Sequence, residues 1–324
     1  MINSAFHHTS KKQVLKITFV LFACSLFFSC NDYFKNDYKD NSPTSGHLNV
    51  YYDEGLYLHL KNQAYTFESQ YPSAHIHLKP SNDNDAVEAL YKDSCEAIVI
   101  SRLLNDKEKK AFASKRFDPK YSCLAYSGIA FVINKNAAIK TISLNEVLQL
   151  AGSENAEVID TNGNTIKLQL LLDKNNSSLA HYVLDSVLKG KKLSANVRVL
   201  NSTLEALNYI ENNNNTIACI DFAWLSDKDD SITKHYSQRL KLLGIRKGEG
   251  KITFPSQSSF KLGDYPLTRK VYCYRKTGDF TLAKGFETYL AGPKGQMTFL
   301  KQGLLPFKQQ ERMVEVKFES LNTQ

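Results

Sequence analysis

Short apolar runs alternate with helical patterns along the first part of the chain. Residues 47–52 read as a strand, and residues 56–69 carry Leu56, Leu60, Ala64 and Phe67 at helical spacing. A second strand at 75–78 is followed by a helix that starts in Pro80–Asp83 and continues through Ala86 and Leu90. The continuous apolar run 97–100 is typical of a buried parallel strand, and a charged helix is expected at 106–115. This alternation predicts a parallel sheet with helices on both faces.

The rest of the chain continues the same α/β alternation. Ser143 with Glu146, and Ser202 with Glu205, have capping-box spacing at two helix starts. Further strands are predicted at 126–134, 167–172, 217–220, 241–245 and 270–274, and helices from residue 179, at 280–290 and at 293–302, with a long loop at 247–263. On size alone, two lobes are favoured over one large sheet.

The first thirty residues are predicted to be a targeting segment rather than part of the fold. Lys11, Lys12 and Lys16 precede an apolar run at 17–28, which is too short to cross a bilayer. Ser29 and Cys30 close the run and resemble a bacterial lipoprotein signal, in which cleavage before Cys30 is followed by lipidation of its thiol. The prediction is a signal at 1–29 and a polar tether at 30–46. A short N-terminal membrane anchor or a buried helix remains the alternative.

The net charge of the chain gives little support for a nucleic-acid partner. The chain has 41 Lys+Arg against 33 Asp+Glu, a formal charge of +8. Loss of the three signal lysines lowers this charge to +5, and the remaining basic residues are dispersed, without the aromatic and basic interleaving of a binding module. We therefore expect no nucleic acid as partner.

Cysteine and histidine positions predict neither a cofactor nor a catalytic site. Four cysteines follow Cys30, each in or beside a strand-like run, and they are predicted to be small core residues whose possible disulfide pairs the sequence cannot assign: Cys95, Cys123, Cys219 and Cys273. His75 and His77 alternate on one strand face and could ligate a metal, but no third ligand is apparent, so solvent-facing histidines are favoured. The sequence contains no HExxH, GxSxG or P-loop motif, and we expect a protein that is not an enzyme, with no catalytic residue, metal or cofactor.

Three segments together resemble a known family. The blocks FETYLAGPKGQMTFLKQGLLP (286–306), GDYPLTRKVYCYRK (263–276) and AEVIDTNGNTIKLQLLLDKNNSSLAHYV (156–183) are similar to the phosphate-type substrate-binding proteins of ABC importers. The resemblance covers roughly residues 47–310 and implies a two-lobed α/β clamp, the type II periplasmic binding protein fold. It implies a first lobe made of 47–130 plus 251–324, a second lobe made of 131–250, and a ligand captured between them.

The expected ligand is a small oxyanion, with phosphate as the first hypothesis. Backbone N–H groups at helix starts, hydroxyls and a cation suit such a ligand, and four candidate starts follow predicted strand ends. They supply Asp53, Gly55, Ser81, Asn82, Ser101, Arg102, Asn176, Ser177 and Ser178. Each serine could instead be an ordinary helix cap.

The segment at Asp173–Leu179 departs from the family pattern of Arg followed by Ser-Gly-Thr, since Lys174 is the nearest cation. The alternative is therefore a clamp-fold surface or periplasmic interaction protein that no longer binds phosphate. The resemblance implies an ABC permease as partner, a monomer, and a lipid-anchored location facing the periplasm or the cell surface. The sequence cannot distinguish the inner from the outer membrane, or show that a cognate importer exists.

Overall fold

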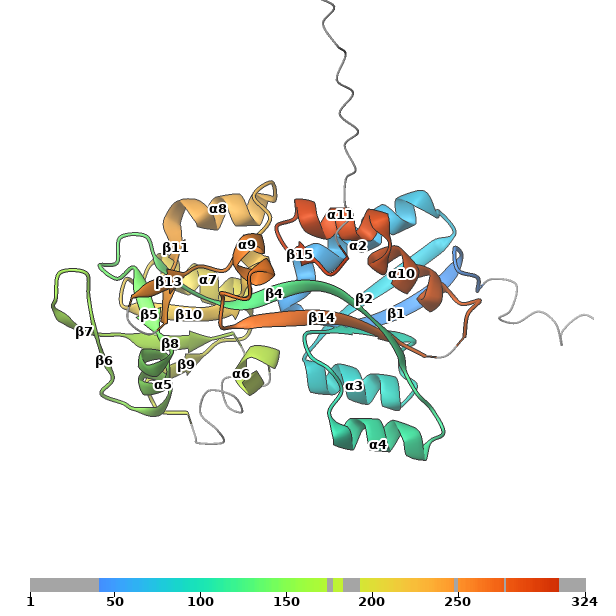
Figure 1. The fold of residues 1–324 in the computed structure, drawn as a ribbon, viewed down its shortest axis with the longest axis horizontal. Helices are drawn as coiled ribbons and strands as arrows, with labels where there is room; N and C mark the ends of the chain where they lie inside the picture. Colours follow the sequence, from blue (N-terminus) through green and yellow to red (C-terminus); the bar gives the residue numbers. More distant parts are fainter. Residues whose placement is uncertain (1–40, 174–176, 183–192, 248–249, 277, 309–324) are drawn as a thin grey trace, which may run out of the picture.

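The computed structural model describes residues 41–173, 177–182, 193–247, 250–276 and 278–308 (Figure 1). The predictions for the signal, for Cys30, for most of the tether and for Asn176 lie outside these ranges. The strands are β1 Gly46–Asp53, β2 Ala74–Ser81, β3 Ala97–Ile100, β4 Lys120–Asn134, β5 Thr141–Ser143, β6 Glu157–Ile159, β7 Thr165–Lys167, β8 Gln169–Leu172, β9 Val197–Val199, β10 Thr216–Asp221, β11 Leu240–Leu242, β12 Gly244–Lys247, β13 Lys251–Thr253, β14 Thr268–Arg275 and β15 Leu305–Pro306. The helices are α2 Tyr57–Gln70, α3 Asp83–Tyr91, α4 Asp106–Ser114, α5 Leu144–Gly152, α6 Ser178–Tyr182, α7 Thr203–Glu211, α8 Ser231–Arg239, α9 Gln257–Lys261, α10 Leu282–Ala291 and α11 Pro293–Lys301, with 3-10 turns η1 Glu54–Leu56 and η3 Phe222–Leu225.

One ten-stranded sheet runs through both halves of the molecule in the order β2-β1-β3-β14-β4-β10-β8-β9, with β11 and β15 also paired to β4. The two long strands β4 and β14 pass between the halves (Figure 1). The predicted two-lobed α/β architecture is therefore confirmed, and the strand-like crossovers are β4 and β14.

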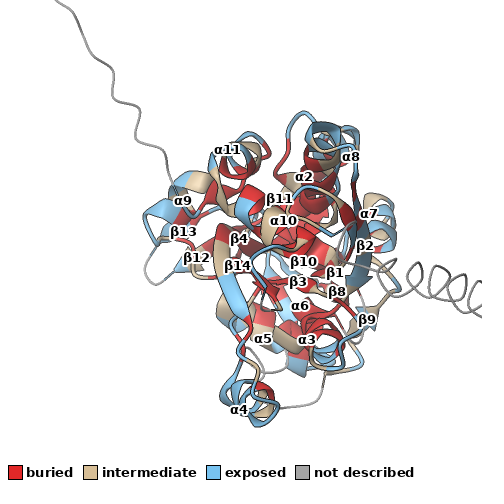
Figure 2. Ribbon diagram, turned by 90° about the vertical axis from the view of Figure 1, so that its right-hand side faces the viewer, coloured by how far each residue is buried: buried red, intermediate tan, exposed pale blue. Residues whose placement is uncertain are grey.

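The first lobe is a three-layer arrangement around β1, β2 and β3. Figure 1 places α2, α10 and α11 on one face of its sheet and α3 and α4 on the other. Alternate residues of β3 enter two separate apolar clusters: Ala97 and Val99 face the α2 side, whereas Ile98 and Ile100 face the α3 side. A strand buried on both faces needs an unbroken apolar run, which explains the pattern seen in the sequence. Figure 2 shows the buried residues along these strands, with α4 largely exposed.

The second lobe is built around β10, whose six residues are all buried. Strands β8 and β9 extend this part of the sheet in parallel with β10. Two small sheets, β13-β12-β5 and β6-β7, lie at its periphery. The boundary predicted at residue 251 falls before β13, which pairs with β12 of the second lobe, so the exact division of the chain stays a prediction.

The predicted loop at 247–263 was wrong in part, because it contains β13 and α9. Ser256 caps α9 by accepting a hydrogen bond from the Ser259 amide at 3.1 Å, a short-range signal that we did not use. The capping box at Ser143 and Glu146 is confirmed. Ser202 caps α7 as predicted, but Glu205 accepts from the Asn201 amide instead of the cap residue.

The four described cysteines are unpaired thiols: Cys95, Cys219 and Cys273 are buried, and Cys123 is half-buried. Within the part of the chain that the structure describes, no helix has the length and apolar character needed to cross a membrane.

Candidate ligand-binding site

The ends of two neighbouring strands bring Asp53 and Ser101 together. Asp53 ends β1, and Ser101 directly follows β3, which pairs with β1 in parallel. The Ser101 hydroxyl donates to Asp53 Oδ2 at 2.7 Å, and the Gly55 amide donates to Asp53 Oδ1 at 3.2 Å. Asp53 and Ser101 are both buried, so this part of the predicted site forms one cluster inside the molecule.

Arg269 joins this cluster to the second lobe. It lies on β14 opposite Ser127 of β4. Its guanidinium donates to Asp221 Oδ2 and lies 3.5 Å from Asp53 Oδ2, so one cation holds a carboxylate from each lobe. Asp221 ends β10 and also accepts from the Ser127 hydroxyl at 2.6 Å. We missed both partners: Asp221 has the same strand-end signal as Asp53, whereas Arg269 has none in the sequence.

Gly55 is needed for the approach of the two lobes. A Cβ atom added at Gly55 would lie 2.7 Å from the Cβ of Asp221, closer than side-chain carbon atoms approach in real structures. We expected Gly55 to let a ligand come close to the backbone, and the neighbour found there is Asp221 of the second lobe. The glycine therefore permits the Arg269–Asp221 contact to form beside β1.

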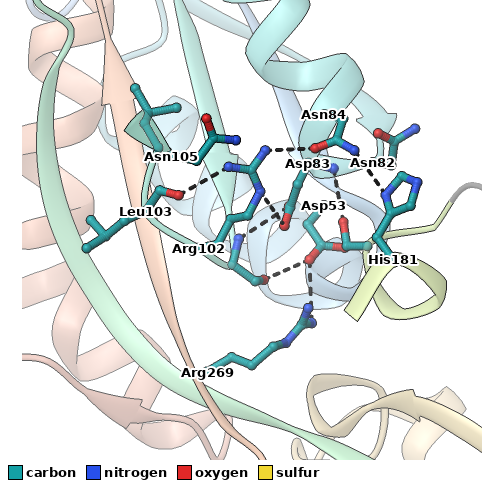
Figure 3. A network of polar contacts seen from close by, with 12 residues as sticks. Asp53, Asn82, Asp83, Asn84, Arg102, Leu103, Asn105, His181 and Arg269 are labelled. Carbon is teal, nitrogen blue, oxygen red and sulfur yellow. Dashed lines mark hydrogen bonds and ion pairs between the residues drawn. The ribbon is translucent and has the colours of Figure 1, made fainter. Parts of the chain in front are cut away.

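Direct hydrogen bonds also link the start of α3 to α6 across the lobes (Figure 3). The Asp83 amide donates to the Ser178 hydroxyl at 3.0 Å, and the Asn84 side chain contacts His181 Nδ1 at 3.2 Å. This contact brings Ser178 to the first-lobe cluster. Ser177 is buried beside it and accepts from the Ala180 amide at 2.9 Å.

The predicted residues at the start of α3 take up different positions. Asn82 is the N-cap residue and accepts from the Asp85 amide at 2.9 Å, whereas Ser81 is the last residue of β2. The Ser81 hydroxyl donates to the Asn82 carbonyl at 3.1 Å, so it does not cap the helix.

Arg102 is half-buried at the edge of this cluster (Figure 3). Its two terminal nitrogens donate to Glu108 at 2.8 and 2.7 Å, and Nη2 also donates to Asn84 at 2.8 Å. Its Nε lies 3.7 Å from Asp83 Oδ2. Acidic groups of the first lobe therefore already balance the charge of Arg102. Arg102 is not an unpaired cation that would attract an anion.

Carboxyl groups dominate the buried part of the site. Four are nearly inaccessible, with exposed fractions of 4% for Asp53, 5% for Asp83, 4% for Asp173 and 0% for Asp221, against 7% for Arg269. Asp173 directly follows β8 in the second lobe and accepts a hydrogen bond from the Thr203 hydroxyl at 3.3 Å. Among the described residues, Arg269 Nε is a buried donor without a hydrogen-bond partner, and it is a point where a ligand oxygen could bind.

The pKa of Asp53 is raised from 3.8 to about 7, chiefly by burial and then by the neighbouring Asp83 carboxylate, with Arg269 acting in the opposite direction. Burial also raises the pKa of Asp173. For Arg269, burial alone would lower the pKa, but Asp221 and Asp53 outweigh it and raise the pKa. Burial therefore disfavours the ionised forms of Asp53 and Asp173 in this cluster.

Replacing Asp53 with asparagine is expected to raise the free energy of unfolding near pH 8. Because the folded-state pKa of Asp53 lies above its unfolded value, ionisation destabilises the fold as the pH rises from about 4 to about 7. The gain in Asp53→Asn should shrink steadily as the pH falls through that window, measured by urea unfolding at several pH values. The exposed Asp118→Asn serves as control, with a small change at every pH; a pH-independent gain in Asp53→Asn would contradict the assignment.

The comparisons with known proteins identify the superfamily and the fold of the chain. A family model described as "PBP superfamily domain" matches residues 41–294. The chain belongs to the PBP superfamily. No curated protein matches the sequence. The family model bears out the predicted kinship to the periplasmic binding proteins at the level of the superfamily.

Three solved structures share the PBP fold with the chain. A putative phosphate ABC transporter substrate-binding protein with bound phosphate from Clostridium perfringens aligns at a TM-score of 0.66 and 17% identity, over 81% of this chain and 100% of its own. An ABC-type phosphate transport receptor from Vibrio cholerae gives a TM-score of 0.60 at 14% identity, over 81% and 100% of the two chains. A possible phosphate binding protein from Planctomyces limnophilus gives 0.55 at 17% identity, over 81% and 93%.

Proposed function

We propose that this PBP-superfamily chain is a lipid-anchored solute-binding protein that captures a small oxyanion, phosphate first, between its lobes. The observation that carries the proposal is the meeting of Ser101, Ser178 and the start of α3 at one place between the lobes. The similar Clostridium perfringens protein holds phosphate, which supports the same ligand class here. The four buried carboxyl groups lie in the same place, so an oxyanion bound there would be close to groups that repel it when they are ionised.

In the proposed mechanism the chain acts passively. With the lobes apart, the Asp83 amide loses Ser178 as its partner and can donate to an oxyanion, as helix N-termini commonly do. Ser101, Ser178 and Arg269 Nε add further donors, and closure about β4 and β14 excludes water. The closed form is proposed to dock, as a monomer, on an ABC permease that contacts both lobes.

The proposed location is the cell envelope, with Cys30 lipidated and the lobes facing the periplasm or the cell surface. Lipidation rests on the sequence pattern at residues 11–30. Metabolic labelling with a fatty acid analogue, with Cys30→Ala as the unlabelled variant, tests it.

A clamp that no longer binds phosphate is the second candidate, and one observation favours it. Asp53, Asp83, Asp173 and Asp221 outnumber the cations of the buried site, and Arg269 is already paired. A doubly charged anion entering this site meets like charges in a poorly screened interior. The two candidates therefore differ in whether any oxyanion binds.

Calorimetric titration with phosphate and sulfate separates the two candidates. If the solute-binding proposal is right, phosphate should release heat and raise the melting temperature more than sulfate does. Ser178→Ala should weaken phosphate binding at least about tenfold, because a hydrogen bond to a charged group contributes about 1.5–3 kcal/mol. Ser143→Ala, which removes the cap of α5, is the matched control and should bind normally. If neither anion gives heat or a shift in melting temperature, the second candidate replaces the first.

A further inference from the structure

Pairing of the two outer strands of the first lobe gathers three histidines on one exposed surface. The register places His47 of β1 opposite His75 of β2, and Asn49 opposite His77. All three histidine side chains are exposed. The sequence showed His75 and His77 two residues apart but no third histidine nearby, because the parallel pairing that adds His47 bridges 28 residues of chain.

The rings of these histidines are in direct contact. His47 Nδ1 and His77 Nε2 are 3.1 Å apart, and the two ring planes are inclined by only 1°. The His75 ring stacks on His47 with 4.8 Å between the ring centroids. Over the described ranges, no three His, Cys, Asp or Glu side chains are arranged to enclose a metal ion, so these contacts define a two-nitrogen pair and an adjacent ring.

We propose that His47 Nδ1 and His77 Nε2 form a two-histidine site for a divalent transition-metal ion such as Zn²⁺, with water in the remaining positions. Two nitrogens that each lie about 2.0–2.1 Å from a tetrahedral zinc ion are roughly 3.3 Å apart, so the observed separation is close to the one required. In the metal-free structure the two nitrogens share a hydrogen bond, so binding must release that proton and turn both rings until the nitrogens converge on the ion. Imidazole nitrogen is a preferred ligand of zinc, copper and nickel. Binding requires the tautomers in which both facing nitrogens are unprotonated, with the ring protons on His47 Nε2 and His77 Nδ1. His75 is a positioning residue, since its stacking restricts the His47 ring.

This site is separate from the candidate ligand-binding site between the lobes. His47 and Asp53 lie near opposite ends of β1, about 20 Å apart at the rise of an extended strand. The described thiols are poor competitors for the metal, because burial raises the pKa of Cys123 to about 11 and that of Cys95 to about 12. Metal binding at His47 and His77 can therefore be tested independently of phosphate binding.

The test is calorimetric titration of the full chain, made without an added histidine tag, with ZnCl₂ and separately with NiCl₂. The expected result is one saturable event per chain whose affinity falls at least about tenfold in His47→Gln and in His77→Gln, as loss of a ligand should weaken binding at least as much as loss of a supporting contact. His235→Gln is the matched control: His235 is exposed on α8 beside Arg239, and its removal should leave the affinity unchanged.

Metal-free melting curves should coincide for all four proteins, which separates lost ligation from lost folding. Absence of saturable heat with either metal overturns the proposal. Unchanged affinity in His77→Gln overturns it equally, because the metal would then be bound elsewhere in the chain.

Discussion

Arg269→Ala is expected to lower the free energy of unfolding by about 3–5 kcal/mol, the usual cost of removing one partner from a buried ion pair. The substitution leaves the buried carboxylates of Asp53 and Asp221 without the guanidinium that both contact. Because Arg269 also connects the strand ends of the two lobes, we expect the contact between them to loosen. Urea unfolding, monitored by circular dichroism, measures this decrease in the free energy of unfolding.

The double variant Arg269→Met with Asp221→Asn is the informative control. It removes one charge of each sign, so its loss should be clearly smaller than that of Arg269→Ala alone. The deficit of Arg269→Ala should also shrink as the pH is lowered from about 8 to about 5, because Asp53 can then take up a proton. Equal losses in the single and double variants, or a deficit independent of pH, would show that the cost comes from lost packing rather than unpaired charge.

Glu287→Ala is expected to cost a similar amount in the first lobe. Glu287 of α10 accepts from Arg275 Nε at 2.6 Å and from the Ser122 hydroxyl at 2.7 Å, so it ties the helix to both long strands. Arg275 and Glu287 are each 3% exposed, and alanine leaves the buried guanidinium with only the exposed Asp279 carboxylate, 3.5 Å away, as an acidic partner. The expected loss is again about 3–5 kcal/mol in the free energy of unfolding, measured by the same method.

Two further variants identify the cause of that loss. Lys284→Ala removes only the more exposed partner of Glu287, whose Nζ lies 3.4 Å from Glu287 Oε2. This change should lower the free energy of unfolding by less than about 1 kcal/mol. Arg275→Met combined with Glu287→Leu replaces the whole pair by apolar groups and should recover much of the stability. If this double variant is less stable than Glu287→Ala, the ion pair stabilises the lobe beyond the avoidance of an unpaired charge.

Local signals in the sequence were sufficient for much of the fold and for part of the site. Strand ends marked Asp53 and Ser101, because an apolar run followed by a polar residue identifies the carboxyl edge of a parallel strand. The same rule applies to Asp221, which we overlooked. Capping patterns located the starts of α5 and α7.

Long-range pairing explains the residues that could not be predicted. Arg269 lies in a strand whose sequence shows no sign of the two carboxylates that it contacts, since one is 216 residues and the other 48 residues away in the chain. The role of Gly55 likewise depends on Asp221 of the other lobe. The small sheet β6-β7 was missed because three-residue strands are too short to give a periodic pattern.

The position of β14 in the sheet has a consequence for biosynthesis. β3 lies between β1 and β14, and β14 is followed in the chain only by α10, α11 and β15 among the described elements. A growing chain can therefore make β1, β2 and β3 early, yet one edge of β3 stays open until residues 268–275 leave the ribosome. An open apolar strand edge invites pairing with other chains. The first lobe is thus the first part of the molecule to be synthesised and the last to complete its sheet. A chain truncated before β14 is therefore expected to aggregate rather than fold into a stable first lobe.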